Sequence, residues 1–287
     1  MPSASCLYGT ATVQLDSASR IEFADPRPGP ARHIPLWLYR PRALVPSAPP
    51  VIVLHGMSRN ADAYRDAWAD SADRFGFAVA APEFSAAEYP DALDYNFGNM
   101  VSPDGTLLPR AQWLFPVIDQ IYLRVREALG SNSERYYLYG HSAGAQLVHR
   151  LATFAWSPRI AFAISANAGS YTMPVFDIDY PFGLRRTAFT EADMPSLLSR
   201  PLAVLLGEED NDAAHHNLPR QAGAMAQGAH RLARGQRYIQ TAGRVAAERQ
   251  VPFAWQLITV PGVGHSNPGM APAAAALFAS NSARDPG

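Results

Sequence analysis

The sequence predicts an α/β protein with a mostly parallel central sheet that is flanked by helices on both faces. Strand-like and helix-like segments alternate along the chain, and several apolar runs are short and continuous. Alternation is typical of parallel sheets, and continuous apolar runs are typical of strands buried on both faces. Of the 287 residues, 48% are hydrophobic and 17% are charged, which is ample for a packed core. We predict one domain over residues 1–287.

The expected strands are short runs of apolar or alternating residues: 34–39, 50–54, 77–81, 136–139, 160–165, 201–206 and 254–260. The expected helices carry apolar residues at intervals of three and four: 61–75, 115–129, 145–152, 228–250 and 268–279. Gly76 and Gly130 directly follow two of these helices, where a glycine commonly ends a helix. Residues up to about 30 are predicted to form an N-terminal extension, and the tail after Ser280 is predicted to fray.

Charge and cysteine content exclude several classes of partner. Lys and Arg number 24 against 25 Asp and Glu, with no long run of one sign, so neither nucleic acid nor an anionic membrane surface is expected. No stretch approaches the ~18 continuous apolar residues of a membrane span. Cys6 is the only cysteine, which excludes an intramolecular disulfide. The first residues lack a basic start and an apolar core, so a cytoplasmic location is expected, with an export signal already removed as the alternative.

A candidate nucleophile lies in the G-x-S-x-G pentapeptide Gly140–Gly144, with Ser142 at its centre. A strand-like run, 136–139, comes before it, and a helical pattern follows it. A serine in a tight strand-to-helix turn is a nucleophile elbow, and the turn leaves no room for side chains at the flanking glycines. The turn presents the hydroxyl at the edge of the sheet, where a base can reach it.

A serine hydroxyl needs a histidine to take its proton, and that histidine needs a carboxylate to orient it. With this elbow the expected chain order is Ser, then Asp or Glu, then His. His265 follows the last expected strand in a glycine-containing loop, and we predict that it is the base. Asp210 follows the strand 201–206 and is the predicted acid. Asp212 is the alternative, and Glu208 and Glu209 are weaker candidates.

The developing oxyanion requires backbone N–H donors. One is expected from Ala143, the residue after the nucleophile, and the other from the loop after an early strand. That loop is 54–58, where Met57 is the first choice and Ser58 the second. His55 is expected to brace this loop rather than to titrate during catalysis.

Candidate substrate-lining residues are Arg59, Tyr171 and His141. The alternative for Arg59 is that it holds the oxyanion loop, the alternative for Tyr171 is a packing role, and the alternative for His141 is that it only fills the motif. The segment 171–195 has no clear period and is rich in aromatic residues and prolines. Irregular stretches of this length are commonly functional, so we predict that it lies near the active site. Tyr95, Phe97 and Trp113 are candidates for a cleft wall or for the core. His215 and His216 are adjacent, without a third ligand at a useful spacing, so no metal site is predicted.

From about Ile34 to Phe278 the chain resembles the α/β-hydrolase superfamily and, within it, the branch of polyhydroxybutyrate depolymerases and feruloyl esterases. The segments that carry the resemblance are 54–57, followed by Tyr64 and Trp68, then 72–79, 81–83, 140–144 and 264–265. The resemblance implies the α/β-hydrolase fold and ester hydrolysis. Extracellular members often have a cysteine after the His-Gly pair, where this chain has Met57, and they use disulfides that this chain lacks. These departures weaken the expectation of polymer depolymerisation and leave ester hydrolysis intact.

The sequence therefore predicts a serine hydrolase that cleaves carboxylic esters through an acyl-enzyme, with Ser142, His265 and Asp210 as its triad. Neither a metal nor an organic cofactor is expected, and the substrate is a small or oligomeric ester. The first alternative is hydrolysis of amide or peptide bonds by the same triad. The second is a hydrolase fold that only binds a ligand. Acyl preference and oligomeric state do not follow from the sequence.

Overall fold

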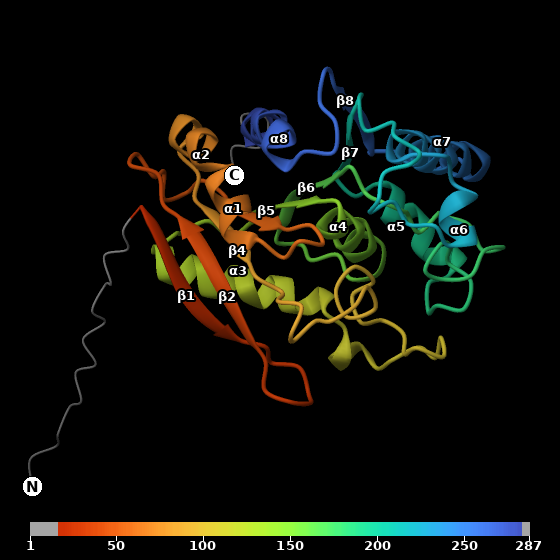
Figure 1. The fold of residues 1–287 in the computed structure, drawn as a ribbon, viewed down its shortest axis with the longest axis horizontal. Coiled ribbons are helices and arrows are strands. Elements are labelled where there is room, and N and C mark those ends of the chain that lie inside the picture. Colours follow the sequence, from red (N-terminus) through yellow and green to blue (C-terminus); the bar gives the residue numbers. More distant parts are fainter. Residues whose placement is uncertain (1–16, 283–287) are drawn as a thin grey trace, which may run out of the picture.

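The computed structural model describes residues 17–282, in which eight strands form one sheet in the order β1-β2-β4-β3-β5-β6-β7-β8 (Figure 1). The strands are β1 (Ala18–Ala24), β2 (His33–Tyr39), β3 (Val51–Leu54), β4 (Val79–Pro82), β5 (Tyr136–His141), β6 (Ile160–Ala166), β7 (Leu202–Gly207) and β8 (Gln256–Val260). β1 and β2 run antiparallel to their neighbours, and the pairs from β4 through β8 are parallel. The predicted fold class, an α/β protein with a mostly parallel sheet, is confirmed.

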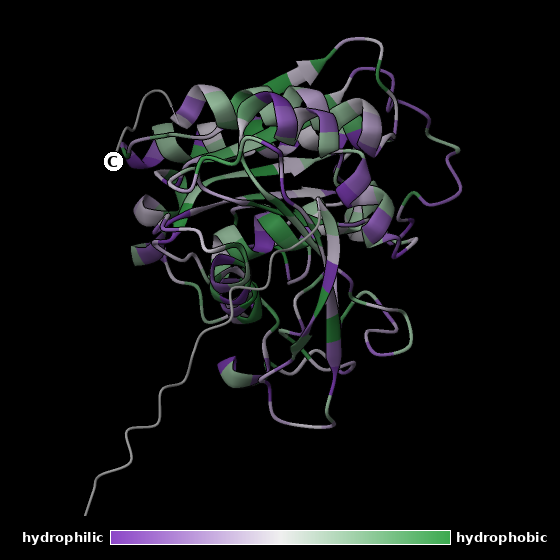
Figure 2. Cartoon of the chain, turned by 90° about the vertical axis from the view of Figure 1, so that its left-hand side faces the viewer, coloured by the Kyte–Doolittle hydropathy of each residue, from purple (hydrophilic) through white to green (hydrophobic). Residues whose placement is uncertain are grey.

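The helices lie on both faces of the sheet. They are α1 (Ala61–Asp66), α2 (Ala69–Phe75), α3 (Phe115–Leu129), α4 (Ala143–Phe154), α5 (Met194–Leu198), α6 (Ala222–Met225), α7 (Arg231–Arg249) and α8 (Asn267–Ser282), with two short 3-10 turns, η1 (Arg110–Gln112) and η2 (Glu191–Asp193). Successive strand residues face opposite sides. Ile52 and Leu54 therefore join one core with α3, α4, α5 and α7, whereas Val51 and Val53 join a second core with α1, α2 and α8. Figure 2 shows apolar residues along the inner strands and hydrophilic residues on the outward helix faces.

Two elements differ from the expectation. The helix expected over 61–75 is divided into α1 and α2, and the break places Trp68 against Tyr139 of β5 and Phe278 of α8, at 4.8 Å and 6.1 Å between ring centroids. Within the predicted N-terminal extension, residues 18–24 form β1, which pairs with β2 along its whole length. Cys6 and the rest of the extension up to residue 16 lie outside the described residues.

The topology brings the loops that follow the parallel strands to one edge of the sheet. The chain passes from β3 to β4 on one side of β3 and then to β5 on its other side. Ligands of open α/β sheets bind at such a switch point, beyond the carboxyl ends of the strands. The segments that follow β3, β5, β6, β7 and β8 all reach this edge. β8 is the last strand of the sheet, and Leu257 within it is 39% exposed.

Candidate active site

Ser142 lies in a tight turn in which the residues two positions before and after it pack closely against neighbouring backbone. It connects β5 to α4 with φ 57° and ψ −111°, a rarely populated conformation for a residue with a side chain. A Cβ on Gly140 would lie 2.4 Å from the backbone of Gly144, and a Cβ on Gly144 would lie 2.2 Å from the carbonyl oxygen of Leu54. Both flanking positions of the pentapeptide therefore require glycine, and the serine is held at the amino end of α4.

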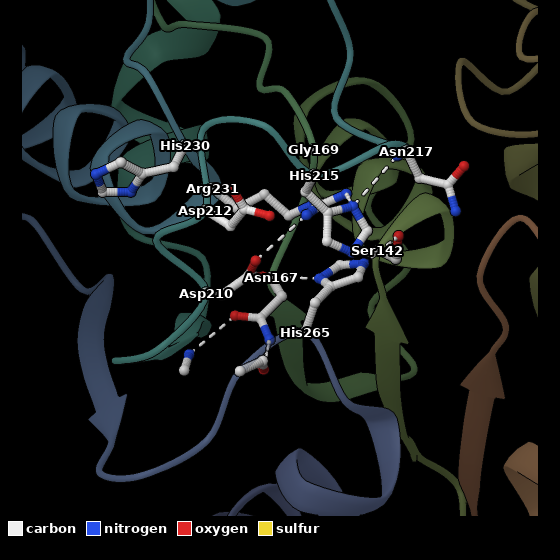
Figure 3. Close-up of polar contacts among 12 residues, drawn as sticks. Ser142, Asn167, Gly169, Asp210, Asp212, His215, Asn217, His230, Arg231 and His265 are labelled. Carbon is white, nitrogen blue, oxygen red and sulfur yellow. Dashed lines mark hydrogen bonds and ion pairs between the residues drawn. The ribbon is translucent and has the colours of Figure 1, made fainter.

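The structure brings Ser142, His265 and Asp210 together in one hydrogen-bonded chain (Figure 3). Ser142 Oγ lies 3.0 Å from Nε2 of His265, and Nδ1 of His265 lies 2.7 Å from Oδ2 of Asp210. Because a carboxylate only accepts, Nδ1 carries the proton and Nε2 is left to accept from the serine hydroxyl. The three side chains come from the segments after β5, β8 and β7, respectively.

Asp212, the alternative acid, is exposed and forms its hydrogen bond elsewhere than on His265. Its carboxylate accepts a hydrogen bond from the Ala214 N–H at 2.7 Å, within its own loop. Glu208 accepts from the hydroxyl of Thr259 at 2.8 Å and makes no contact with the histidine. Of the carboxylates in this loop, the structure places Asp210, which is 3% exposed, against His265.

Two residues outside the predicted site hold the hydrogen-bonded series of Ser142, His265 and Asp210 in place. Arg231, at the start of α7, donates from Nη1 to Oδ1 of Asp210 at 3.2 Å, and both side chains are nearly inaccessible to solvent, at 1% and 2%. Asn167, after β6, accepts from the Gly207 N–H at 2.9 Å and donates to the carbonyl of Gly264 at 3.2 Å. Asn167 thus ties the end of the acid-bearing strand to the loop that carries the histidine.

A sequence signal for Arg231 existed. Arg231 and Arg234 extend the buried stripe of α7, which continues through Tyr238, Ala242 and Val245. Charged residues at helical spacing on an apolar face are rarely buried without a partner. The pattern therefore indicates a buried acceptor. For Asn167, the partners lie 40 and 97 residues away in the sequence, and no local pattern points to them.

Two further imidazoles lie against the His265 ring. His141 is buried with a ring-centroid distance of 4.7 Å, and His215 contacts His265 edge-on at 5.3 Å. Burial lowers the pKa of His141 well below its ordinary value, with further lowering from His265 and Arg231. Its Nδ1 lies 3.0 Å from the hydroxyl of Tyr64. His141, a candidate substrate-lining residue, therefore lies beneath His265 as a neutral packing partner.

The loop after β3 lies next to the nucleophile. A Cβ built on Gly56 would lie 3.5 Å from Cβ of Ser142, and the N–H of Gly144 donates to the carbonyl of His55 at 3.0 Å. Met57, whose side chain is 47% exposed, directly follows Gly56 in this loop, and Ala143 directly follows the serine as the first residue of α4. The N–H groups of the first helical turn have no acceptor within the helix.

His55 holds the loop after β3 in place through hydrogen bonds of its ring. Its Nε2 accepts from the Phe84 N–H at 3.0 Å, so Nδ1 donates to the carbonyl of Gly56 at 2.9 Å. Tyr95 donates to the His55 carbonyl at 2.8 Å. Complete burial lowers the pKa of His55 to about 3, which keeps the ring neutral.

Arg59 also braces the loop. Its guanidinium donates to the carbonyls of Phe84 at 3.1 Å and Tyr89 at 2.9 Å, and it stacks over the ring of Tyr95 at 4.5 Å. Both terminal nitrogens of Arg59 therefore donate to acceptors of the protein itself. Of the two alternatives for this residue, the contacts favour the loop-holding one.

The segment 171–195 packs against α4, where Tyr171 contacts His149 and Tyr180 contacts Phe154. Tyr171 is fully buried and stacks on Tyr238 at 4.6 Å, and its ring is 5.1 Å from that of His149. Further along, Tyr180 donates to the carbonyl of Phe97 at 2.6 Å. Tyr171 is therefore a core residue by its contacts, as are the buried Tyr95 and Trp113.

Over residues 17–282, no group of three or more His, Cys, Asp or Glu side chains is arranged to hold a metal ion. No described helix is both long enough and apolar enough to cross a membrane. Fold and site together define the class: an α/β-hydrolase with a serine at the elbow between β5 and α4.

Solved structures identify the family. The chain is 40% identical to poly(aspartic acid) hydrolase-1 from Sphingomonas sp. KT-1, over 91% of this chain and 98% of that one, with a TM-score of 0.86. It is 36% identical to a poly(3-hydroxybutyrate) depolymerase from Bordetella parapertussis, over 91% and 89% of the two chains, with a TM-score of 0.83. A fluorophosphonate-binding serine hydrolase of Staphylococcus aureus shares the fold at 14% identity and a TM-score of 0.55, over 93% and 99%. No protein-family model and no curated protein sequence matches the chain.

The chain belongs to the α/β-hydrolase superfamily, in the branch that includes the poly(3-hydroxybutyrate) depolymerase and poly(aspartic acid) hydrolase. The resemblance drawn from the motifs is thereby confirmed, and the protein is a hydrolase.

Proposed function

We propose that the protein hydrolyses carboxylic esters through a covalent acyl-enzyme on Ser142. The observation that carries the proposal is the hydrogen-bonded chain from Ser142 Oγ through His265 to Asp210, with distances of 3.0 Å and 2.7 Å. Ser142 attacks the ester carbonyl while Nε2 of His265 takes the hydroxyl proton. Asp210 keeps the proton of His265 on Nδ1 and stabilises the imidazolium that forms.

In this proposal, the N–H groups of Met57 and Ala143 bind the oxyanion that develops on the carbonyl oxygen. The positions of these residues support this role, because the loop after β3 lies against Ser142 and Ala143 is the first residue of α4. Donors that are fixed before the reaction need no reorganisation, and one of them typically contributes about 3–4 kcal/mol to the transition state. His265 then returns its proton to the leaving alcohol, and water hydrolyses the acyl-enzyme by the reverse sequence of proton transfers.

The test combines activity with active-site labelling. Ser142→Ala is expected to lower kcat for a short-chain ester by at least about a thousandfold, because the nucleophile is lost while the oxyanion donors remain. A fluorophosphonate probe is expected to label the wild-type protein and not the variant. Ser280→Ala is the matched control, since that exposed serine bonds only within α8, to the Ala276 carbonyl. Full ester hydrolysis by Ser142→Ala would overturn the proposal, and so would an unlabelled wild-type protein.

A second candidate is hydrolysis of amide bonds by the same residues. It is favoured by the relative at 40% identity, which is named as a hydrolase of poly(aspartic acid), a polyamide. The acyl-transfer chemistry is shared, so the difference lies in how well His265 protonates an amine leaving group. Matched ester and anilide substrates with one acyl group separate the two: a kcat/KM for the anilide equal to that for the ester favours the amide hydrolase.

A further inference from the structure

His215 lies on the loop between β7 and α6 and has a fixed tautomer. Its Nδ1 is 3.2 Å from the backbone N–H of Asn217 and 3.3 Å from Nη2 of Arg231. Both partners can only donate, because an amide N–H and a guanidinium carry no acceptor. Nδ1 must therefore hold a lone pair, and the ring proton is on Nε2.

The ring also stays uncharged. Partial burial lowers the pKa of His215, and the nearby Arg231, His265 and His216 lower it further. A proton on Nδ1 would face two N–H donors, which agrees with that direction. Among the described residues, Nε2 of His215 has no hydrogen-bond partner, and the side chain is partly exposed. His215 therefore presents a neutral, oriented N–H that no protein acceptor uses.

This donor lies beside the ring of His265. The rings of His215 and His265 are 5.3 Å apart at an angle of 71°. Figure 3 shows His215 between Asn217 and His265, on the side of the site where Ser142 lies. Since His265 must hand its proton to the leaving atom, the leaving group lies along the edge of the His265 ring. The first atoms beyond the scissile bond are then near His215.

We propose that His215 is a specificity-determining residue that donates a hydrogen bond from Nε2 to an acceptor oxygen of the leaving group. This inference rests on the proposed function. A donor at this place favours esters whose leaving group carries a carbonyl or carboxylate oxygen a few bonds past the scissile oxygen. The next repeat unit of an oligomer has such an oxygen, whereas a simple alkanol has none.

The same guanidinium serves both the acid and this donor. Arg231 contacts Asp210 through Nη1 and His215 through Nη2, and it is 1% exposed. Because one guanidinium contacts both side chains, Arg231 fixes the orientation of the His215 ring relative to Asp210 and His265. His216, by contrast, is exposed and stacks on the outer side of His215 at 4.7 Å.

The experiment measures kcat and KM for three butyryl esters with alcohols of similar length: n-butanol, methyl β-hydroxypropionate and free β-hydroxypropionate. The wild-type protein is expected to prefer the last two over the n-butyl ester. In His215→Phe, that preference in kcat/KM is expected to fall by about two- to tenfold, the range for one neutral hydrogen bond. A larger fall for the free acid identifies a carboxylate as the acceptor, because charge-assisted bonds are stronger.

Two further variants distinguish binding from packing. His215→Gln keeps an N–H donor at a similar reach and is expected to retain part of the preference, whereas His216→Phe is expected to retain all of it. Equal losses on the three esters in His215→Phe, or a preference unchanged in that variant, would overturn the inference and leave the proposed function intact. A wild-type protein that cleaves none of the esters would overturn the proposed function itself.

Discussion

The buried ion pair between Arg231 and Asp210 supports a quantitative prediction for Arg231→Met. The two atoms Nη1 and Oδ1 are 3.2 Å apart, and neither side chain has more than 2% of its surface exposed. Methionine keeps much of the length of the arginine side chain and removes its charge. The variant therefore leaves the Asp210 carboxylate buried, with His265 as its remaining side-chain partner.

The expected cost follows from Coulomb's law and from measured pairs. At 3.2 Å and an effective dielectric constant of about 20, two unit charges attract by about 5 kcal/mol, since 332/(20 × 3.2) ≈ 5. Removing one partner of a buried pair costs about 3–5 kcal/mol in proteins. Because His265 still donates to Oδ2, we expect the lower end, a loss of about 3 kcal/mol in the free energy of unfolding.

Urea unfolding monitored by tryptophan fluorescence measures this loss. Arg244→Met is the matched control on the same helix, because the Arg244–Glu248 pair is more than half exposed on both sides. Pairs of that kind contribute about 0.5 kcal/mol or less. In a background that carries Asp210→Asn, the cost of Arg231→Met is expected to fall, since the buried negative charge is gone.

The reasoning is refuted if Arg231→Met unfolds at the urea concentration of the wild-type protein. It is also refuted if the cost of the substitution is the same with Asp210 and with Asn at that position, since the charge would then not be its source. Activity provides a second readout: kcat is expected to fall as well, because Asp210, the proposed triad acid, loses its fixed partner.

Two predictions concern the fold around the site. Gly144→Ala is expected to lower the free energy of unfolding in urea by about 1–3 kcal/mol, since the added Cβ would lie 2.2 Å from a carbonyl oxygen of β3. Gly243→Ala is the control and should not lower it, because a Cβ there makes an ordinary van der Waals contact. His55, His141 and His149 have pKa values that burial holds below 6.5. Below about pH 6.5 the unfolded chain binds protons that the folded chain does not, so each should lower the free energy of unfolding by about 1.4 kcal/mol per pH unit. A urea midpoint that is unchanged between about pH 7.5 and about pH 5.5 would contradict this.

The sequence predicted the features whose causes lie close together along the chain. The elbow at Ser142 is such a feature, because the two glycines that the turn requires stand two residues to either side. The helix over 115–129 is another, since its apolar period and its closing Gly130 are local. The alternation of strands and helices sufficed for the fold class, which is confirmed. The catalytic roles of Ser142, His265 and Asp210 stay predictions with the tests given above.

The rest depends on contacts between segments that are far apart in the sequence. The stripe of α7 indicates that Arg231 has a buried acceptor, but Asp210 lies 21 residues away and is recognised as that acceptor only when α7 packs beside the end of β7. His215 has no role in the sequence-based prediction, because no third metal ligand accompanies it and His216, yet folding places it against His265. Tyr171 was a candidate for lining the substrate, and its stacking on Tyr238 could not be read from its neighbours in the chain.

The position of β8 has a consequence for how this protein loses activity. Ser142, the proposed nucleophile, follows β5, a strand in the middle of the sheet in which every residue is buried. His265, the proposed base, follows β8, an edge strand of the sheet with an exposed outer side. Edge elements with fewer buried contacts open at a lower free energy than the core. Under the proposed mechanism, detachment of this strand alone withdraws the proton acceptor, so we expect activity to be lost while the core remains folded.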